Sequence, residues 1–167
     1  MAYEYLRQRD DLFVFSTKND KDYVVAFQFS TDYFTHTCTH CKSIYEVYVN
    51  CINDDEPPYD SQTMETVMSI INEFSQNGTV AAVMYKCYNG DGKGCKREAR
   101  FERTFENSEL ENFEFYSHTY EFEVDEGTIE LRYNLLAASN HMNYGEIVDE
   151  FYQAPNYWIS DSTFEEE

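Results

Sequence analysis

The chain has 167 residues, of which 42% are hydrophobic and 17% aromatic. This is enough apolar side chain for one domain with a well-formed core, and it excludes a chain that is disordered over most of its length. The formal charge of −20, from 32 acidic and 12 basic residues, repels polyphosphates and anionic lipids. Nucleic acid and membranes are therefore excluded as general partners, and a protein partner is expected to have a basic surface.

The expected location is the cytoplasm. No run of apolar residues approaches the length needed to span a bilayer, and the N-terminal stretch has no apolar core of the kind found in signal peptides. The five cysteines are odd in number and are not spaced as a disulfide framework, which favours a reducing compartment.

Three strands are expected in the first third of the chain. Residues 12–17 and 22–30 are rich in β-branched and aromatic side chains and flank a polar turn, so they predict a hairpin. A third strand is expected over residues 43–53. It must end before Pro57 and Pro58, because two prolines cannot continue a hydrogen-bonded ladder.

A helix is predicted to begin at Asp60 or Ser61 and to end at Asn77 and Gly78. Its apolar residues recur every three or four positions, at Met64, Val67, Met68, Ile71 and Phe74. The run that follows, residues 79–88, is apolar enough to be a central strand.

The second half of the chain predicts a helix, a hairpin and a further helix. The first helix covers residues 95–110 and presents Phe101 and Phe105 to the core. The hairpin joins strands 118–124 and 129–136, in which apolar and polar residues alternate. A short last helix is expected over residues 143–153.

The predicted order is therefore β-β-β-α-β-α-β-β-α. Strands in hairpins, rather than in repeated βαβ units, favour an α+β fold with one mainly antiparallel sheet covered by two to three helices. We assign residues 1–155 to this single domain. Residues 156–167 form an acidic tail that we expect to be disordered unless a partner orders it.

The first candidate site is a segment rich in metal-ligating side chains: His36, Cys38, His40 and Cys41. A structural zinc needs four such ligands, and this segment supplies a single Cys-x-x-Cys knuckle, to which Cys87 or Cys95 could add a ligand. The alternative is an extended strand, because threonines alternate with these residues over positions 35–40. We expect no cofactor, with zinc as the alternative.

The second candidate site is the stretch from Gly90 to Arg103, a glycine-rich loop followed by the start of a helix. Backbone N–H groups at a helix start can hold an anion. Five basic residues fall on one side of this helix: Lys93, Lys96, Arg97, Arg100 and Arg103. The alternative is that they pair with Glu98, Glu102 and Glu106 and only relieve charge repulsion.

No catalytic residue is assigned. His118 and His141 could each act as a base, but neither is accompanied by a nucleophile motif. Pairs of carboxylates carry no signal in a chain that is so rich in acids.

The stretch from Glu65 to Phe105 resembles an uncharacterised family of small α+β proteins, a domain of unknown function, from Bacteroides-type bacteria and their mobile elements. The resemblance rests on a helix, a strand ending in Tyr85-x-Cys87, a polar loop, and a helix that carries Arg97, Arg100 and Phe101, all preceded by an N-terminal hairpin. It implies an α+β fold and no particular function, because the family has no assigned activity.

We expect a small, acidic, non-enzymatic protein-binding modulator of the immunity, antitoxin-like or phage anti-defence inhibitor type. This expectation rests on the negative charge, the excess of tyrosine and the lack of a recognisable catalytic motif in the sequence. The alternative is an anionic small-ligand binding protein, or an enzyme, that uses the Gly90–Arg103 loop and helix start. A homo-oligomer is compatible with either.

Overall fold

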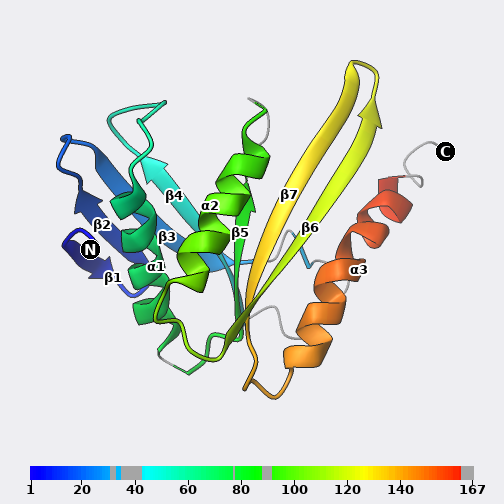
Figure 1. Ribbon diagram of the computed structural model, residues 1–167. Coiled ribbons are helices and arrows are strands. Elements are labelled where there is room, and N and C mark those ends of the chain that lie inside the picture. Colours follow the sequence, from blue (N-terminus) through cyan, green and yellow to red (C-terminus); the bar gives the residue numbers. More distant parts are fainter. Residues whose placement is uncertain (31–32, 35–42, 77, 88–91, 163–167) are drawn as a thin grey trace.

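The computed structural model describes residues 1–30, 33–34, 43–76, 78–87 and 92–162. Within these residues the chain is an α+β domain of seven strands and three helices (Figure 1). The strands are β1 (Tyr5–Arg9), β2 (Leu12–Ser16), β3 (Asp22–Phe29), β4 (Ile44–Cys51), β5 (Ala82–Cys87), β6 (Phe113–Val124) and β7 (Gly127–Ala138). The helices are α1 (Ser61–Ser75), α2 (Gly94–Glu106) and α3 (Tyr144–Ser162).

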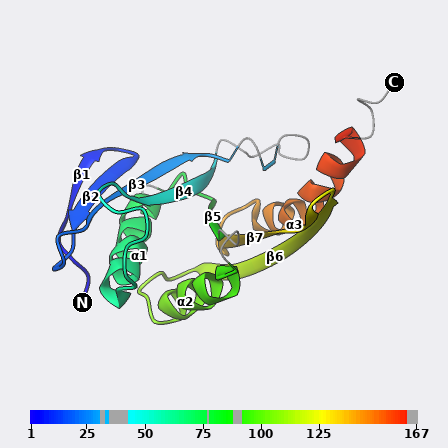
Figure 2. The ribbon, with the colours of Figure 1, turned by 90° about the horizontal axis from the view of Figure 1, so that it is seen from above.

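All seven strands belong to one sheet with the order β1-β2-β3-β4-β5-β7-β6. Neighbouring strands are antiparallel, except β4 and β5, which are parallel. Helices α1 and α2 cover one face of the sheet, and α3 packs on the other face (Figure 2). None of the helices in the described ranges is long and apolar enough to cross a bilayer.

The prediction of one mainly antiparallel sheet with helices is confirmed. The predicted order of elements, β-β-β-α-β-α-β-β-α, lacked one strand. The additional strand is β1, which pairs with β2 at the edge of the sheet. Most of its residues are exposed and polar, since an edge strand needs few apolar side chains. The hairpin detail also differs in part: strands in hairpins were expected rather than repeated βαβ units, and one βαβ unit is present, formed by β4, α1 and β5.

The larger core lies between the sheet and helices α1 and α2. Helix α1 begins as predicted: the Asp60 carboxylate accepts a hydrogen bond from the backbone N–H of Gln62, 3.0 Å away. Aromatic rings stack across this layer. The ring centroid of Phe74 in α1 lies 3.8 Å from that of Phe27. The ring centroid of Phe101 in α2 lies 4.4 Å from that of Tyr85. These stacks fix both helices on the sheet.

The smaller core lies under α3, which buries Ile147, Phe151 and Ala154. The helix continues to Ser162 and so extends beyond the predicted end at residue 153. Its backbone overlaps the segment 156–167 that the sequence predicted as a tail, and residues 163–167 lie outside the described ranges.

A proline inside α3 is compensated by a tyrosine from another part of the chain. Pro155 has no N–H, so the carbonyl oxygen of Phe151, four residues earlier, lacks its usual helical donor. The hydroxyl of Tyr33 donates to this oxygen at 2.6 Å. Tyr33 is buried, and burial raises its pKa, so the phenol remains a donor over the physiological pH range.

This arrangement predicts an energetic coupling between Tyr33 and Pro155. Tyr33→Phe leaves a buried carbonyl unsatisfied and should lower the free energy of unfolding by about 1–3 kcal/mol. In a Pro155→Ala background residue 155 regains its N–H, so the same substitution should cost clearly less. Urea unfolding of the four chains measures the coupling. An equal cost in both backgrounds would show that the hydroxyl does not compensate for the proline.

His118 of β6 packs among aromatic rings beneath α3. Its ring centroid lies 4.2 Å from that of Tyr120 and 5.3 Å from that of Tyr152. Burial lowers the pKa of His118, because the charged form loses hydration. The folded chain thus binds the proton more weakly than the unfolded chain, whose histidines have a pKa of about 6.5. The stability that neutral His118 contributes is complete above the pKa of the unfolded chain. It is lost as the pH falls through the lower pKa that His118 has in the folded chain.

We therefore expect the free energy of unfolding to fall between about pH 7 and pH 5, and to fall less steeply in His118→Gln. Carboxylates that titrate in the same range are common to both chains, so the difference in slope isolates the histidine. Urea unfolding at several pH values measures it. Parallel pH profiles for the two chains would contradict the assignment.

Candidate functional site

The parallel strands β4 and β5 diverge soon after they begin. They pair through Ile44↔Ala82, Tyr45↔Val83 and Glu46↔Met84, and no pairing follows although both strands continue. Figure 1 shows the strands separating toward their carboxyl ends. Each strand leads into a helix, so α1 and α2 both begin at this edge of the sheet. In open sheets the edge formed by the carboxyl ends of parallel strands is a common place for ligands.

The two helix starts at this edge differ in charge. Asp60 caps α1 with a carboxylate. Helix α2 has Lys93 at its N-cap, no side-chain capping bond and no acidic residue in its first turn. Because a helix start has a partial positive charge, the start of α2 favours an anion.

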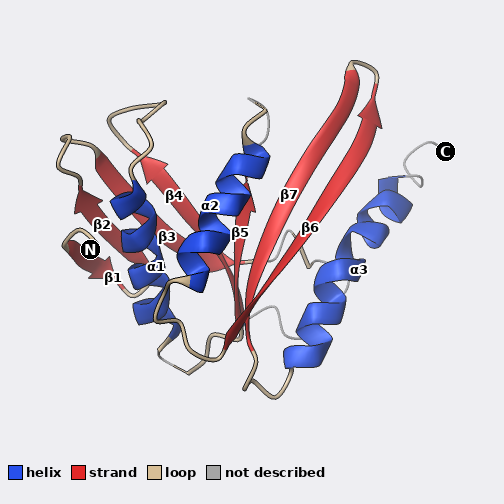
Figure 3. Cartoon of the chain, viewed as in Figure 1, coloured by secondary structure: helices blue, strands red, loops and turns tan. Residues whose placement is uncertain are grey.

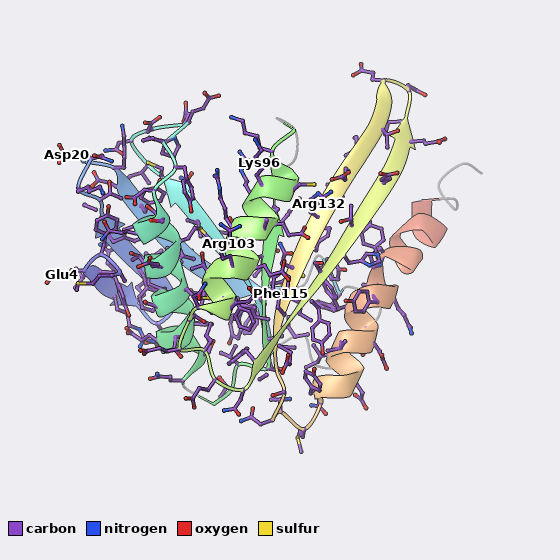
Figure 4. The ribbon with its side chains drawn as sticks, viewed as in Figure 1. Glu4, Asp20, Lys96, Arg103, Phe115 and Arg132 are labelled. Carbon is purple, nitrogen blue, oxygen red and sulfur yellow. The ribbon has the colours of Figure 1, made fainter. Side chains whose placement is uncertain are left out.

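The structure separates the five predicted anion-binding residues into two groups. Lys93 and Lys96 are exposed near the start of α2, and Arg97 is half-buried. Arg100 and Arg103 lie further along the helix, on the side that faces α1. Figure 4 shows Lys96 and Arg103 along α2, and Arg132 on β7. Residues 88–91 of the glycine-rich loop lie outside the described ranges.

Arg100 and Arg103 line a groove of about 730 Å³ between α1 and α2, which we call the α1–α2 groove. The α1 wall contributes Ser69, Asn72 and Glu73, and Thr104 lies beside the arginines. The guanidinium carbon of Arg100 is 3.8 Å from the ring centroid of Tyr59, a cation–π contact that holds the side chain at the mouth. Sequence reasoning missed Tyr59, although an aromatic residue beside two prolines was a usable signal.

Two of the three glutamates that line the groove, Glu65 and Glu73, bind other partners, and the third, Glu109, is exposed. Glu73 accepts a hydrogen bond of 2.8 Å from the Tyr5 hydroxyl and lies 3.8 Å from the Arg7 guanidinium. Burial, and then this hydrogen bond, raise the pKa of Tyr5 to about 12. Glu65 lies 2.7 Å from the Met1 amino group. Across the described ranges neither Arg100 nor Arg103 forms an ion pair, so the predicted pairing with Glu98, Glu102 and Glu106 is not found for these two arginines.

A second polar cluster lies under the start of α2. Arg132 of β7 pairs with Glu98 of α2 at 3.5 Å and with Glu130, and both Arg132 and Glu98 are 16% exposed. The buried amide of Asn134 donates to the Cys87 sulfur at 3.1 Å. Burial raises the pKa of the Cys87 thiol to about 12, and the negative charge of Glu98 acts in the same direction. Cys87 is therefore a neutral, structural side chain rather than a nucleophile.

The burial of Cys87 and the exposure of Cys95 predict selective alkylation by iodoacetamide. Cys95 is exposed on the first turn of α2 and should be modified at about pH 8, whereas the protonated and buried Cys87 should remain unmodified until the chain unfolds. Peptide mapping by mass spectrometry separates the two sites, and the same reaction in urea is the control. Equal rates at Cys87 and Cys95 in the folded protein would contradict the burial argument.

The predicted metal-binding residues, His36, Cys38, His40 and Cys41, lie outside the described ranges. Among the residues that are described, no group of three or more histidine, cysteine or acidic side chains could hold a metal ion. The zinc alternative stays a prediction.

Comparison with known proteins gives a structural likeness but no sequence match. No family model matches the chain. No curated protein matches it either. A solved structure described as "a putative phosphinothricin N-acetyltransferase" aligns with 80% of this chain and 72% of its own, with 11% identity and a TM-score of 0.48. At this identity and TM-score the likeness concerns general layout, and it assigns no reaction or substrate to this chain.

The prediction of a non-enzymatic protein-binding modulator is corrected: the structural likeness is to a protein described as an N-acetyltransferase, and no comparison supports a modulator. The prediction is withdrawn. The alternative, a site for an anionic small ligand, remains and is developed below from the geometry of the α1–α2 groove.

Proposed function

We propose that the protein binds an anionic small molecule in the α1–α2 groove, with Arg100 and Arg103 as its anchors. The observation that carries this proposal is that neither arginine forms an ion pair within the described residues. In a chain with 32 acidic and 12 basic residues, an arginine is expected to lie beside a carboxylate. These two instead line a groove in which two of the three glutamates, Glu65 and Glu73, are bonded to other groups.

The spacing of the arginines suits a phosphate or diphosphate group. They are one helical turn apart, which corresponds to about 4.5 Å along the axis, so both guanidinium groups can reach one anion. Guanidinium groups bind phosphate oxygens in pairs of parallel hydrogen bonds. The start of α2 lies about 9 Å from Arg100 along the helix and adds positive potential on the same side of the sheet.

The polar surface of the groove supports a ligand that is larger than a free anion. Ser69, Asn72 and Thr104 provide hydroxyl and amide groups near the arginines, and Tyr59 is 57% exposed at the mouth. The volume of about 730 Å³ is in the range of small-molecule sites. We therefore favour a phosphorylated organic molecule over inorganic phosphate.

Thermal unfolding with a panel of pyrophosphate, a nucleoside diphosphate and coenzyme A tests this proposal. A ligand that binds the folded chain alone should raise Tm by about 5–10 °C when its concentration is a hundred times Kd. The double variant R100Q/R103Q should lose this rise, because both anchors are gone while the groove keeps its shape.

The matched control is Arg9→Gln. Arg9 is exposed on β1, pairs with Asp11 and does not line the groove, so this variant removes one positive charge outside the proposed site. It should keep the full ligand-dependent rise in Tm. The proposal is wrong if no anion of the panel stabilises the parent protein, or if Arg9→Gln reduces the rise as much as R100Q/R103Q does.

A further inference from the structure

The distal half of the β6–β7 hairpin is a two-stranded ribbon that is exposed on both faces. The strands pair in unbroken register from Phe113↔Ala138 to Val124↔Gly127. Near the tip Glu121 and Glu123 are exposed, and Val124 and Ile129 are 45% and 48% exposed. Figure 3 shows the tip beyond the ends of α2 and α3. An isolated two-stranded ribbon has only marginal stability in water, so a third strand would stabilise this one.

The outer edge of β6 offers backbone groups for such a strand. β6 is the last strand in the sheet order and is 12 residues long. Proteins usually protect a long edge with a proline, a bulge or a short strand, and this edge has none of these devices in its described length. Its N–H and C=O groups on that side have no strand partner in the sheet.

The charge of the hairpin indicates which kind of strand fits. Residues 113–131 contain no lysine or arginine. Their acidic side chains are Glu114, Glu121, Glu123, Asp125, Glu126 and Glu130. The nearest cation along the chain, Arg132, is already paired with Glu98 and Glu130.

We infer that the outer edge of β6 is a docking site for an extended, basic segment of another polypeptide, which adds to the sheet as a further strand. Backbone hydrogen bonds would supply affinity, and lysine or arginine side chains at alternate positions would pair with the glutamates of β6. A second copy of this chain fits less well, because the same acids would oppose each other across a β6–β6 contact. This surface is separate from the α1–α2 groove, so the inference does not depend on the proposed ligand.

Fluorescence anisotropy with a labelled peptide of about eight residues that alternates lysine and valine tests this inference, since strands of this length are common. The folded protein should bind it saturably. A second peptide of the same sequence, N-methylated at every other residue on the pairing edge, keeps every charge but cannot donate the backbone hydrogen bonds, and should not bind.

Two charge variants locate the surface. E121Q/E123Q should weaken binding about fivefold, because two partly exposed ion pairs are lost. D10N/D11N removes the same number of charges from the exposed turn between β1 and β2 and should bind like the parent protein.

Three results would overturn the inference. The first is absence of saturable binding at low salt, and the second is equal binding of the N-methylated peptide. The third is equal weakening by both charge variants, which would mean general attraction to an acidic surface. Light scattering gives a fourth test. If the protein forms a dimer and the peptide dissociates it, the edge of β6 binds a second copy of this chain instead.

Discussion

The short parallel pairing of β4 and β5 determines the arrangement of the helices. Parallel neighbours cannot be joined by a tight turn, so the chain must cross the face of the sheet, and α1 is that crossing. Helix α2 starts from the same edge after β5. Both helices therefore lie on one face with their starts together, and their packing leaves the α1–α2 groove between them. The pairing stops at Glu46↔Met84, and the two strands separate beyond it (Figure 1).

Charge is the second constraint, and it makes the position of each cation informative. Arg7, Arg9, Lys21 and Arg132 all lie beside carboxylates, as expected for a net charge of −20. The overall field repels an anionic ligand at long range, but salt screens it beyond about 8–10 Å. Inside the groove, direct hydrogen bonds from two guanidinium groups act at much shorter range. An anion can thus bind locally to a protein that repels it globally.

The sequence predicted local features far better than long-range ones. The capping residue and apolar period of α1 were readable because they depend on neighbours three or four positions away. Strand β1 was not, since a polar edge strand carries little periodic signal. The arginines of α2 were identified as a cluster. The contact of Arg100 with Tyr59 was not identified, because it joins side chains separated by a whole strand and helix.

The central strands divide the molecule into two nearly independent halves. Along β5, Val83 packs toward α1 and α2 while Ala82 and Met84 pack toward α3, so the alternation of one strand supports both cores. The α1–α2 groove depends on the first core. Helix α3 depends on the second, where Tyr33 compensates for Pro155. Changes in the packing of α3 can reach the groove only through the sheet, which is buried on both faces at residues 82–84 of β5 and residues 133–138 of β7. A stiff central sheet therefore keeps the geometry of the arginines separate from the far side of the protein.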